Sequence, residues 1–164
     1  MFNLIDVKSF CSALIVVFLP TKLYVMLTLT RRERFCAAHK LANPNWSDEK
    51  NEEVFGRCSN KNWHGHNYEL FVTVKGEIQP ETGFILDLKW LSDILKKKVV
   101  DPFDHRNLNL DVPIFEGKMV STEIVAIEIW NIIEDDIKAK GAELFCVKLN
   151  ETENNSVEYW GPNK

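Results

Sequence analysis

The chain has 164 residues, of which 45% are hydrophobic and 11% aromatic, so it can bury one good core and is expected to form one globular domain. Its formal net charge of −4, from 20 Lys and Arg and 24 Asp and Glu, argues against a nucleic-acid binder with a basic face. Four cysteines stand far apart without a C-x-x-C pair, which argues against a disulfide scaffold and fits a reduced, cytoplasmic enzyme. They are Cys11, Cys36, Cys58 and Cys146.

The N-terminal segment contains an apolar run, FCSALIVVFL, at residues 10–19. This run has the length of a signal-peptide core, but the residues before it are not clearly basic and no A-x-A-like cleavage site follows. Pro20 and Lys22 interrupt the window that a membrane span would need. A targeting signal therefore stays open, and no stable membrane association is expected.

The globular part is expected to begin near Met26. We interpret residues 1–25 as an N-terminal extension of uncertain status and residues 26–164 as the functional domain. No internal repeat or low-complexity tract divides this domain.

The first half of the domain is rich in strand patterns. Apolar and β-branched residues alternate partly over 23–39 and well over 67–78, which predicts two long strands. Between them, Ser47 precedes acidic residues and predicts a short helix over 47–54. The turn sequence QPETG then separates the second strand from a third strand expected to begin at 84–86.

The second half is predicted to contain two helices and a hairpin. Asp87 can cap a helix over 88–100, in which Leu88, Leu91, Leu95 and Val99 form one apolar stripe. A loop is expected over 101–113. Ser121 or Thr122 then opens a second helix that ends near Ala139 before Gly141, and 143–151 and 156–160 form a final hairpin. Strands with two inserted helices predict an α+β domain with an antiparallel sheet.

The sequence CSNKNWHGHNYEL at residues 58–70 suggests a metal site. In extended backbone, His64 and His66 project from the same side, and Gly65 keeps the region uncrowded. A catalytic zinc site usually has three protein ligands and an open fourth position, so another ligand must come from elsewhere. His39, at the end of a predicted strand after two alanines, and His105 are the two candidates. A bare H-x-H pair also occurs in loops without a metal.

Two further residues stand in chemically unusual surroundings. Cys58 lies among polar residues beside Arg57, where a nearby metal or imidazolium would favour a thiolate, although lone cysteines are more often small buried hydrophobes. Glu151 shares a strand face with Phe145, Val147 and Leu149, so a carboxylate is expected on a buried face. It needs donors there, either from the N–H groups of a substrate or from a structural salt bridge.

Five blocks in register identify a family resemblance. They are FCAAHKL, FGRCSNKNWHGHNYELFVTVKGEIQPETGFILDL, DPFDHRNLNLDVPIF, STEIVAIEIW and NETENNSVEY. Over roughly residues 26–161 the chain resembles the 6-pyruvoyltetrahydropterin synthase family. The resemblance implies the tunnelling fold: a four-stranded antiparallel sheet with two helices on one face in each subunit. Three subunits would close a barrel, and two trimers would form a homohexamer with sites between subunits.

The resemblance also implies roles for particular residues. The zinc (Zn²⁺) ligands match His39, His64 and His66. Cys58 matches the catalytic base, and Asp104 with His105 the proton-relay pair. Glu151 matches the carboxylate that anchors the pterin ring, and Thr122 and Glu123 fall on a second pterin-contacting segment.

The implied reaction is that of a lyase in tetrahydrobiopterin biosynthesis, which converts dihydroneopterin triphosphate to 6-pyruvoyltetrahydropterin with loss of triphosphate. His64 stands six positions after Cys58, a spacing that resembles the pyruvoyl-forming enzymes and not the related carboxy-forming ones. The triphosphate needs cations, for which Lys40, Arg57 and Arg106 are candidates.

The chain also departs from the family pattern. Trp63 stands where Gly is usual, Ser59 where Asn is common, and Ile124 where Asn usually follows the Glu. Trp63 borders the metal loop and so bears on loop shape and substrate access. The competing hypothesis is a metal-binding or assembly protein that kept the fold and lost the chemistry. The joint presence of Cys58, Asp104 and His105 argues against it.

Overall fold

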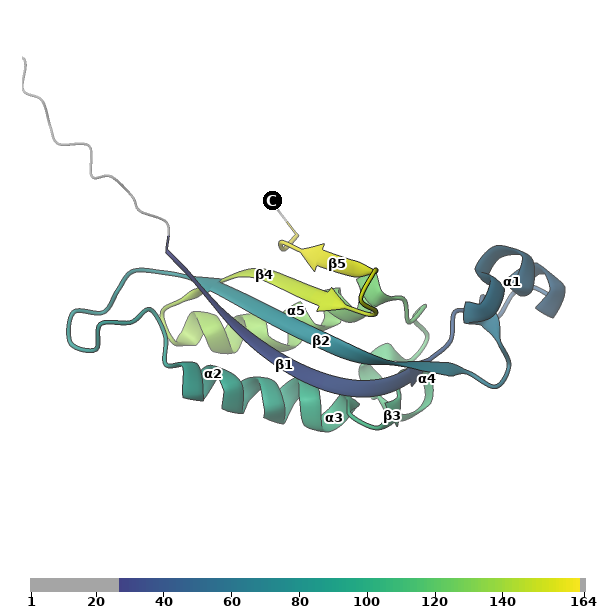
Figure 1. Ribbon diagram of the computed structural model, residues 1–164, viewed down its shortest axis with the longest axis horizontal. Coiled ribbons are helices and arrows are strands. Elements are labelled where there is room, and N and C mark those ends of the chain that lie inside the picture. The colour runs from purple at the N-terminus through teal and green to yellow at the C-terminus, as the bar shows by residue number, and fades with distance from the viewer. Residues whose placement is uncertain (1–26, 163–164) are drawn as a thin grey trace, which may run out of the picture.

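The computed structural model describes residues 27–162, which form one curved sheet with helices on one of its faces (Figure 1). The sheet has the strand order β3-β1-β2-β4-β5. Strands β1, β2, β4 and β5 pair antiparallel, and β3 pairs parallel with the end of β1. The strands are β1 (Thr28–His39), β2 (His64–Lys75), β3 (Arg106–Asn107), β4 (Glu143–Asn150) and β5 (Ser156–Tyr159).

Two helical segments, at residues 88–103 and 122–139, cover one face of the sheet, and a short helix at residues 48–55 lies at its end (Figure 1). The helices are α1 (Asp48–Phe55), α2 (Leu88–Leu95), α3 (Asp101–Phe103), α4 (Leu108–Asp111) and α5 (Thr122–Ala139). A π-helical turn, η2 (Lys96–Val100), joins α2 to α3, and 3₁₀ turns form at η1 (Gly56–Ser59) and η3 (Pro113–Phe115). The expected α+β class, with four antiparallel strands and two main helices on one face, is therefore confirmed, and β3 adds a two-residue parallel strand.

Alternation along the strands creates the core. In β2, Tyr68, Leu70, Val72 and Val74 are fully buried, while the residues between them face the other side of the sheet. Helix α5 buries residues at helical spacing against this face, among them Val125, Ile129, Ile133 and Ile137. Ser121 caps that helix by accepting a hydrogen bond from the Ile124 N–H.

Several predicted elements differ from the structure. The third strand expected from Phe84 is wrong, because residues 80–86 form turns and bends. The four antiparallel strands are β1, β2 and the two strands of the expected final hairpin, β4 and β5. The loop expected over 101–113 contains α3, β3 and α4, because Leu108 and Val112 are apolar enough to be buried. Leu88, expected in the apolar stripe of the first helix, is 42% exposed.

A β-bulge changes which residues of β4 face the core. The register of β2 and β4 shifts between Thr73 and Val74: Thr73 pairs with Cys146, whereas Val74 pairs with Leu144. Phe145 is therefore turned to the open face, where it contacts Trp160 and lies under the Lys75 ammonium. The expectation that Phe145 shares the inner face with Val147 is wrong for this reason.

Two sheet edges are open within residues 27–162. Strand β5 pairs with β4 alone, and β3 covers only Ala37 and Ala38 of β1. Among the described helices, none is long and apolar enough to cross a membrane. The expected N-terminal extension, residues 1–25, lies outside the described residues.

Candidate functional site

Three histidines converge where the two longest strands meet. His39 is the last residue of β1, His64 is the first of β2, and the two face each other in the antiparallel register. His66 follows two residues later on the same face. The ring centroids lie 4.5 Å (His39–His64), 5.1 Å (His39–His66) and 5.0 Å (His64–His66) apart, and one nitrogen from each ring lies within 4.8 Å of the others.

The protonation and the hydrogen bonds of these three rings suit metal binding. His39 Nδ1 lies 2.8 Å from the carbonyl oxygen of Val120 and donates to it, which leaves its Nε2 with a lone pair directed into the cluster. Burial is the largest cause that lowers the pKa of all three imidazoles, so they are neutral at neutral pH. His39 Nε2, both nitrogens of His64 and His66 Nε2 are buried without a hydrogen-bond partner among the described residues. A metal ion would give these orphaned nitrogens a partner, so the residues fit one.

Gly65 lets the two strands approach at this point. A Cβ atom at this position would lie 3.0 Å from the backbone oxygen of Ala37 on β1. That oxygen belongs to the paired strand and cannot swing aside as a side chain would. The glycine between the two histidines is therefore required by the close backbone contact that brings His39 beside them.

Glu151 lies at the edge of the histidine cluster. Its Oε1 accepts a hydrogen bond of 2.7 Å from the Thr122 hydroxyl, and the same oxygen lies 3.5 Å from His39 Nε2 and 3.7 Å from His66 Nε2. Thr122 begins helix α5, and Glu151 follows the last residue of β4. The expected placement of a carboxylate near the core face is confirmed, and its donor within the chain is a hydroxyl.

A cavity of about 460 Å³ brings most of the predicted residues together. Its wall includes His39, Cys58, Thr122, Glu123 and Glu151. Cys58 is half-buried in turn η1, which is tied to the end of β1 by a 2.9 Å hydrogen bond from the Leu41 N–H to the Cys58 carbonyl. A thiol, a carboxylate and an imidazole thus face one small polar space.

Asp104 and His105 form a pair, but at another location. The carboxylate is held from both sides: Oδ1 accepts from the Cys36 N–H at 2.7 Å, and Oδ2 lies 2.8 Å from His105 Nδ1. These two contacts, the backbone one first, lower the pKa of Asp104. His105 adopts a left-handed φ of 57° and leaves its side chain 82% exposed. Within the described chain, neither residue lines the cavity that contains Cys58.

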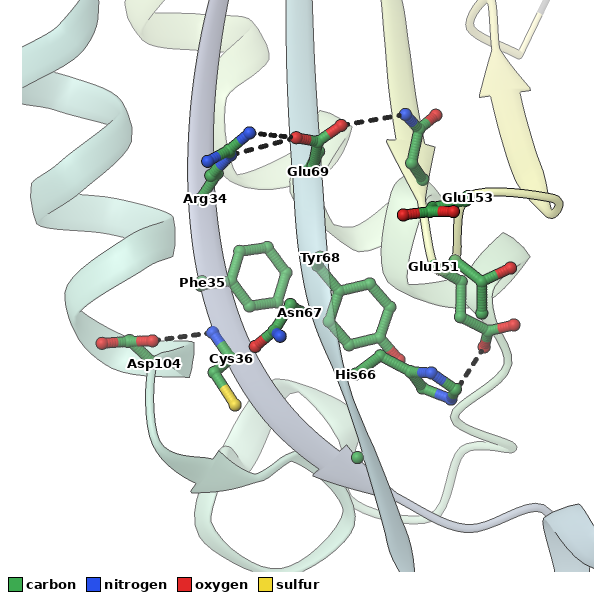
Figure 2. A pocket seen from close by; sticks show the side chains of 13 residues that line it. Arg34, Phe35, Cys36, His66, Asn67, Tyr68, Glu69, Asp104, Glu151 and Glu153 are labelled. Atoms are coloured by element: carbon green, nitrogen blue, oxygen red, sulfur yellow. Dashed lines mark hydrogen bonds and ion pairs between the residues drawn. The ribbon is translucent and has the colours of Figure 1, made fainter.

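Figure 2 shows the side chains that line the larger cavity, of about 810 Å³. Asp104 and Cys36 lie at one end of it, and His66 and Glu151 lie at the other. Between them the Tyr68 ring stands beside His66, with its hydroxyl directed toward His66 and Glu151. Sequence analysis did not single out Tyr68; its place two residues after His66, on the same strand face, was the available signal.

The cationic residues near the site divide into two locations. Lys40 and Arg57 line a cavity of about 680 Å³ together with Lys61, next to the segment that carries Cys58. Arg106 lies in β3, paired with Ala37. The Lys40 ammonium also lies 4.9 Å above the ring of Trp63, which has a left-handed φ of 67°. A glycine is the residue most compatible with such a φ, so Trp63 occupies a strained position directly before His64.

Comparison with known proteins accounts for this arrangement. The family model "6-pyruvoyl tetrahydropterin synthase" matches residues 28–162. The chain is 44% identical over 133 residues to a 6-pyruvoyl tetrahydrobiopterin synthase of Pongo abelii, covering 81% of this chain and 90% of the relative. For the enzyme of that name from Drosophila melanogaster the identity is 42% over 134 residues, covering 82% and 79%.

A solved structure agrees with the sequence relatives. The 6-pyruvoyl tetrahydropterin synthase of Caenorhabditis elegans superposes with a TM-score of 0.78 at 36% identity, covering 84% of this chain and 97% of that one. The family model extends over the strands, helices and histidine cluster described above, and the relatives and the solved structure each cover more than four fifths of the chain. The chain belongs to the 6-pyruvoyl tetrahydropterin synthase family.

Proposed function

We propose that this protein is a zinc-dependent 6-pyruvoyltetrahydropterin synthase, which converts 7,8-dihydroneopterin triphosphate to 6-pyruvoyltetrahydropterin in tetrahydrobiopterin biosynthesis. The observation that carries the proposal is the single cavity in which an orphaned histidine nitrogen, a thiol and a carboxylate meet. Each of the three groups has a task in this reaction. A metal-binding protein without activity would need the histidines alone.

Zinc is the proposed metal, held by His39, His64 and His66. Three neutral imidazoles and an open fourth position are typical of catalytic zinc. When bound, the ion supplies Lewis acidity that makes the protons beside a bound side-chain oxygen easier to remove.

The proton transfers fall to the chain's own residues. Cys58, on the cavity wall, is proposed to remove a proton from the substrate side chain. Asp104 orients His105 through the contact with Nδ1, so that Nε2 is free to carry protons to or from the substrate. Triphosphate leaves by elimination, and tautomerisation of the remaining side chain gives the dicarbonyl product.

Glu151 is proposed to hold the pterin ring. A carboxylate can accept two parallel hydrogen bonds from the N–H groups of the pyrimidine portion, which no neutral side chain does as well. Thr122 already fixes one carboxylate oxygen, and Glu123 lines the same cavity. These three residues form the proposed substrate-binding set.

We also propose a homohexamer, a dimer of trimers, with sites between subunits. Strand β5 and most of β1 have open edges that closure into a barrel would remove. In addition, the Asp104–His105 pair is exposed and does not line its own chain's Cys58 cavity. A neighbouring subunit's Cys58 cavity would give this pair a partner.

The triphosphate is proposed to lie against Lys40 and Arg57. Both line one cavity with Lys61, and the segment of Cys58 forms its boundary with the reaction cavity. Asp48 and Glu52 also line this cavity, so its three cations outnumber two carboxylates, and this excess of positive charge is what supports a polyanion there. The proposed location of the enzyme is the cytoplasm, which four widely separated cysteines favour.

The decisive experiment is an assay of the purified protein with dihydroneopterin triphosphate, with the product identified by mass. The proposal requires 6-pyruvoyltetrahydropterin and free triphosphate, loss of activity after chelation, and recovery with Zn²⁺. Tight zinc binding without any product would favour the metal-binding protein instead.

A further inference from the structure

Tyr68 carries a buried hydroxyl that no part of the described chain satisfies. The residue is 0% exposed, and its phenolic oxygen has no hydrogen-bond partner among residues 27–162. Buried hydroxyls are normally paired, because burial removes the hydrogen bonds that water would supply. At a position inside the core, phenylalanine would fill the same volume without this cost, so packing alone does not explain a tyrosine here.

The ring of Tyr68 is fixed in a narrow range of orientations. It stacks on Phe35 at 5.0 Å, and its centroid lies 5.6 Å from the His66 ring and 6.1 Å from the His39 ring. Both contacts with the histidines are edge-to-face. The hydroxyl therefore points past His66 toward Glu151 (Figure 2). A group held in this way is preorganised for a ligand that enters the space beside the histidines.

The surroundings keep this hydroxyl a donor. Among the groups at this point the phenol is the natural donor, because the Glu151 carboxylate and the unpartnered histidine nitrogens that face the cluster accept. A neutral phenol next to a carboxylate and a thiol can donate its proton in a hydrogen bond without giving it up. It thus complements the residues proposed above, which accept protons or carry charge.

We propose that Tyr68 is a further catalytic residue, whose hydroxyl donates a hydrogen bond to the substrate's side-chain oxygen beside the three histidines. This inference rests on the proposed function. Removal of the first carbon-bound proton by Cys58 moves the electron pair into the ring C=N bond, and return of a proton to the ring carbon leaves this oxygen as a carbonyl. When the next carbon-bound proton is removed, the electron pair moves onto the carbonyl oxygen, which gains negative charge before triphosphate leaves from the adjacent carbon. A fixed donor stabilises this charge more than the neutral hydroxyl of the bound substrate, and so acts on turnover more than on binding.

The test compares Tyr68→Phe with Tyr159→Phe in the full-length, zinc-loaded protein. Tyr159 lies on β5 against Trp130 and serves as the matched loss of a hydroxyl outside the site. For Tyr68→Phe we expect unchanged zinc content, an unfolding temperature equal to or above that of the wild type, kcat lowered about 10- to 150-fold, and KM changed less than about threefold. Tyr159→Phe should match the wild type in zinc content, unfolding temperature, kcat and KM.

A second measurement avoids turnover altogether. Acetohydroxamate is a small anionic oxygen ligand of zinc, and its affinity for the zinc-loaded protein should fall about tenfold in Tyr68→Phe, because the bound oxygen loses its donor. Unchanged kcat and unchanged acetohydroxamate affinity would overturn the inference, and so would loss of zinc or of stability in Tyr68→Phe. If the wild type lacked synthase activity but acetohydroxamate still distinguished the variants, the proposed function would fail while the donor role of Tyr68 toward the metal's oxygen ligand stood.

Discussion

The Thr122 hydroxyl donates a 2.7 Å hydrogen bond to Glu151 Oε1, the same oxygen that lies 3.5 Å from His39 Nε2. One contact thus joins the first turn of α5 to the loop after β4, at the edge of the histidine cluster. The carboxylate is only 20% exposed, so its position depends on this donor more than a solvated carboxylate would. Orientation of the proposed pterin anchor is therefore built into the fold of one subunit.

Removing the donor should weaken substrate binding. Loss of a hydrogen bond of this kind corresponds to about 0.5–1.5 kcal/mol, so Thr122→Ala is expected to raise KM about 2- to 12-fold. Thr122→Ser keeps the hydroxyl and is the control that should stay near the wild type. Glu151→Ala removes the anchor itself and should raise KM far more. Steady-state kinetics on the three variants measures these KM values. Equal KM for Thr122→Ala and Thr122→Ser would refute the role of the hydroxyl.

Zinc content tests the histidine cluster directly. The wild type should bind about one zinc per subunit, and His64→Ala should lose most of it because only two protein ligands remain. His105→Ala is the matched control, since this exposed histidine lies outside the cluster and its variant should keep the metal. Elemental analysis of both variants measures this. Full zinc in His64→Ala would contradict the assignment.

The metal-free protein should lose stability on acidification. Burial lowers the pKa of His39, His64 and His66 in the folded state below the ordinary value of about 6.5. The unfolded chain therefore binds more protons as the pH falls through that value, and folding stability decreases until the lowered folded-state pKa values are reached. Thermal unfolding of chelated protein from pH 7.5 to 5 should show a falling midpoint, and His64→Gln should flatten the slope.

Much of this architecture could be predicted from residue periodicity. The alternation in β1 and β2, the start and end of α5 and the final hairpin reflect local patterns, and they appear as expected. The third strand from Phe84 was wrong because two apolar residues after a turn, Ile85 and Leu86, are buried without being in a strand. The bulge that turns Phe145 outward depends on pairing with Thr73, a distant residue, so no local pattern signals it.

In the candidate site, too, local features could be predicted from the sequence, and features that depend on distant residues could not. The spacing of His64 and His66 on one strand face is a local property, whereas the choice between His39 and His105 as the third ligand depends on strand register, which pairs His39 with His64. Tyr68 was missed because an aromatic residue at an inward position looks like ordinary core. Only the three-dimensional structure reveals that its hydroxyl is buried without a partner in the part of the chain that the structure describes.

Trp63 provides a test of backbone strain beside the metal site. At its φ of 67°, a residue with a Cβ is disfavoured by about 1–2 kcal/mol relative to the right-handed region, while glycine is not. Trp63→Gly and Trp63→Ala both remove the ring and its contact with Lys40, so their difference isolates the backbone. The glycine variant should be more stable by about 1 kcal/mol in denaturant unfolding. A more stable alanine variant would show that this φ is not kept in solution.

Subunit mixing tests whether the reaction site spans two chains. Cys58→Ala and His105→Ala should each lower turnover by about 10²–10⁴, the usual effect of losing one proton-transfer group. If Cys58 of one chain works with His105 of its neighbour, randomly mixed oligomers contain sites in which both residues are intact. With equal amounts, half of the chains supply Cys58 and half of their neighbours supply His105, so activity should recover to about a quarter of the wild type. Each variant unfolded, refolded and assayed alone is the control. If both residues serve one chain's own site, every site lacks one of them, and co-refolding should restore nothing; that result would end the proposal of sites between subunits.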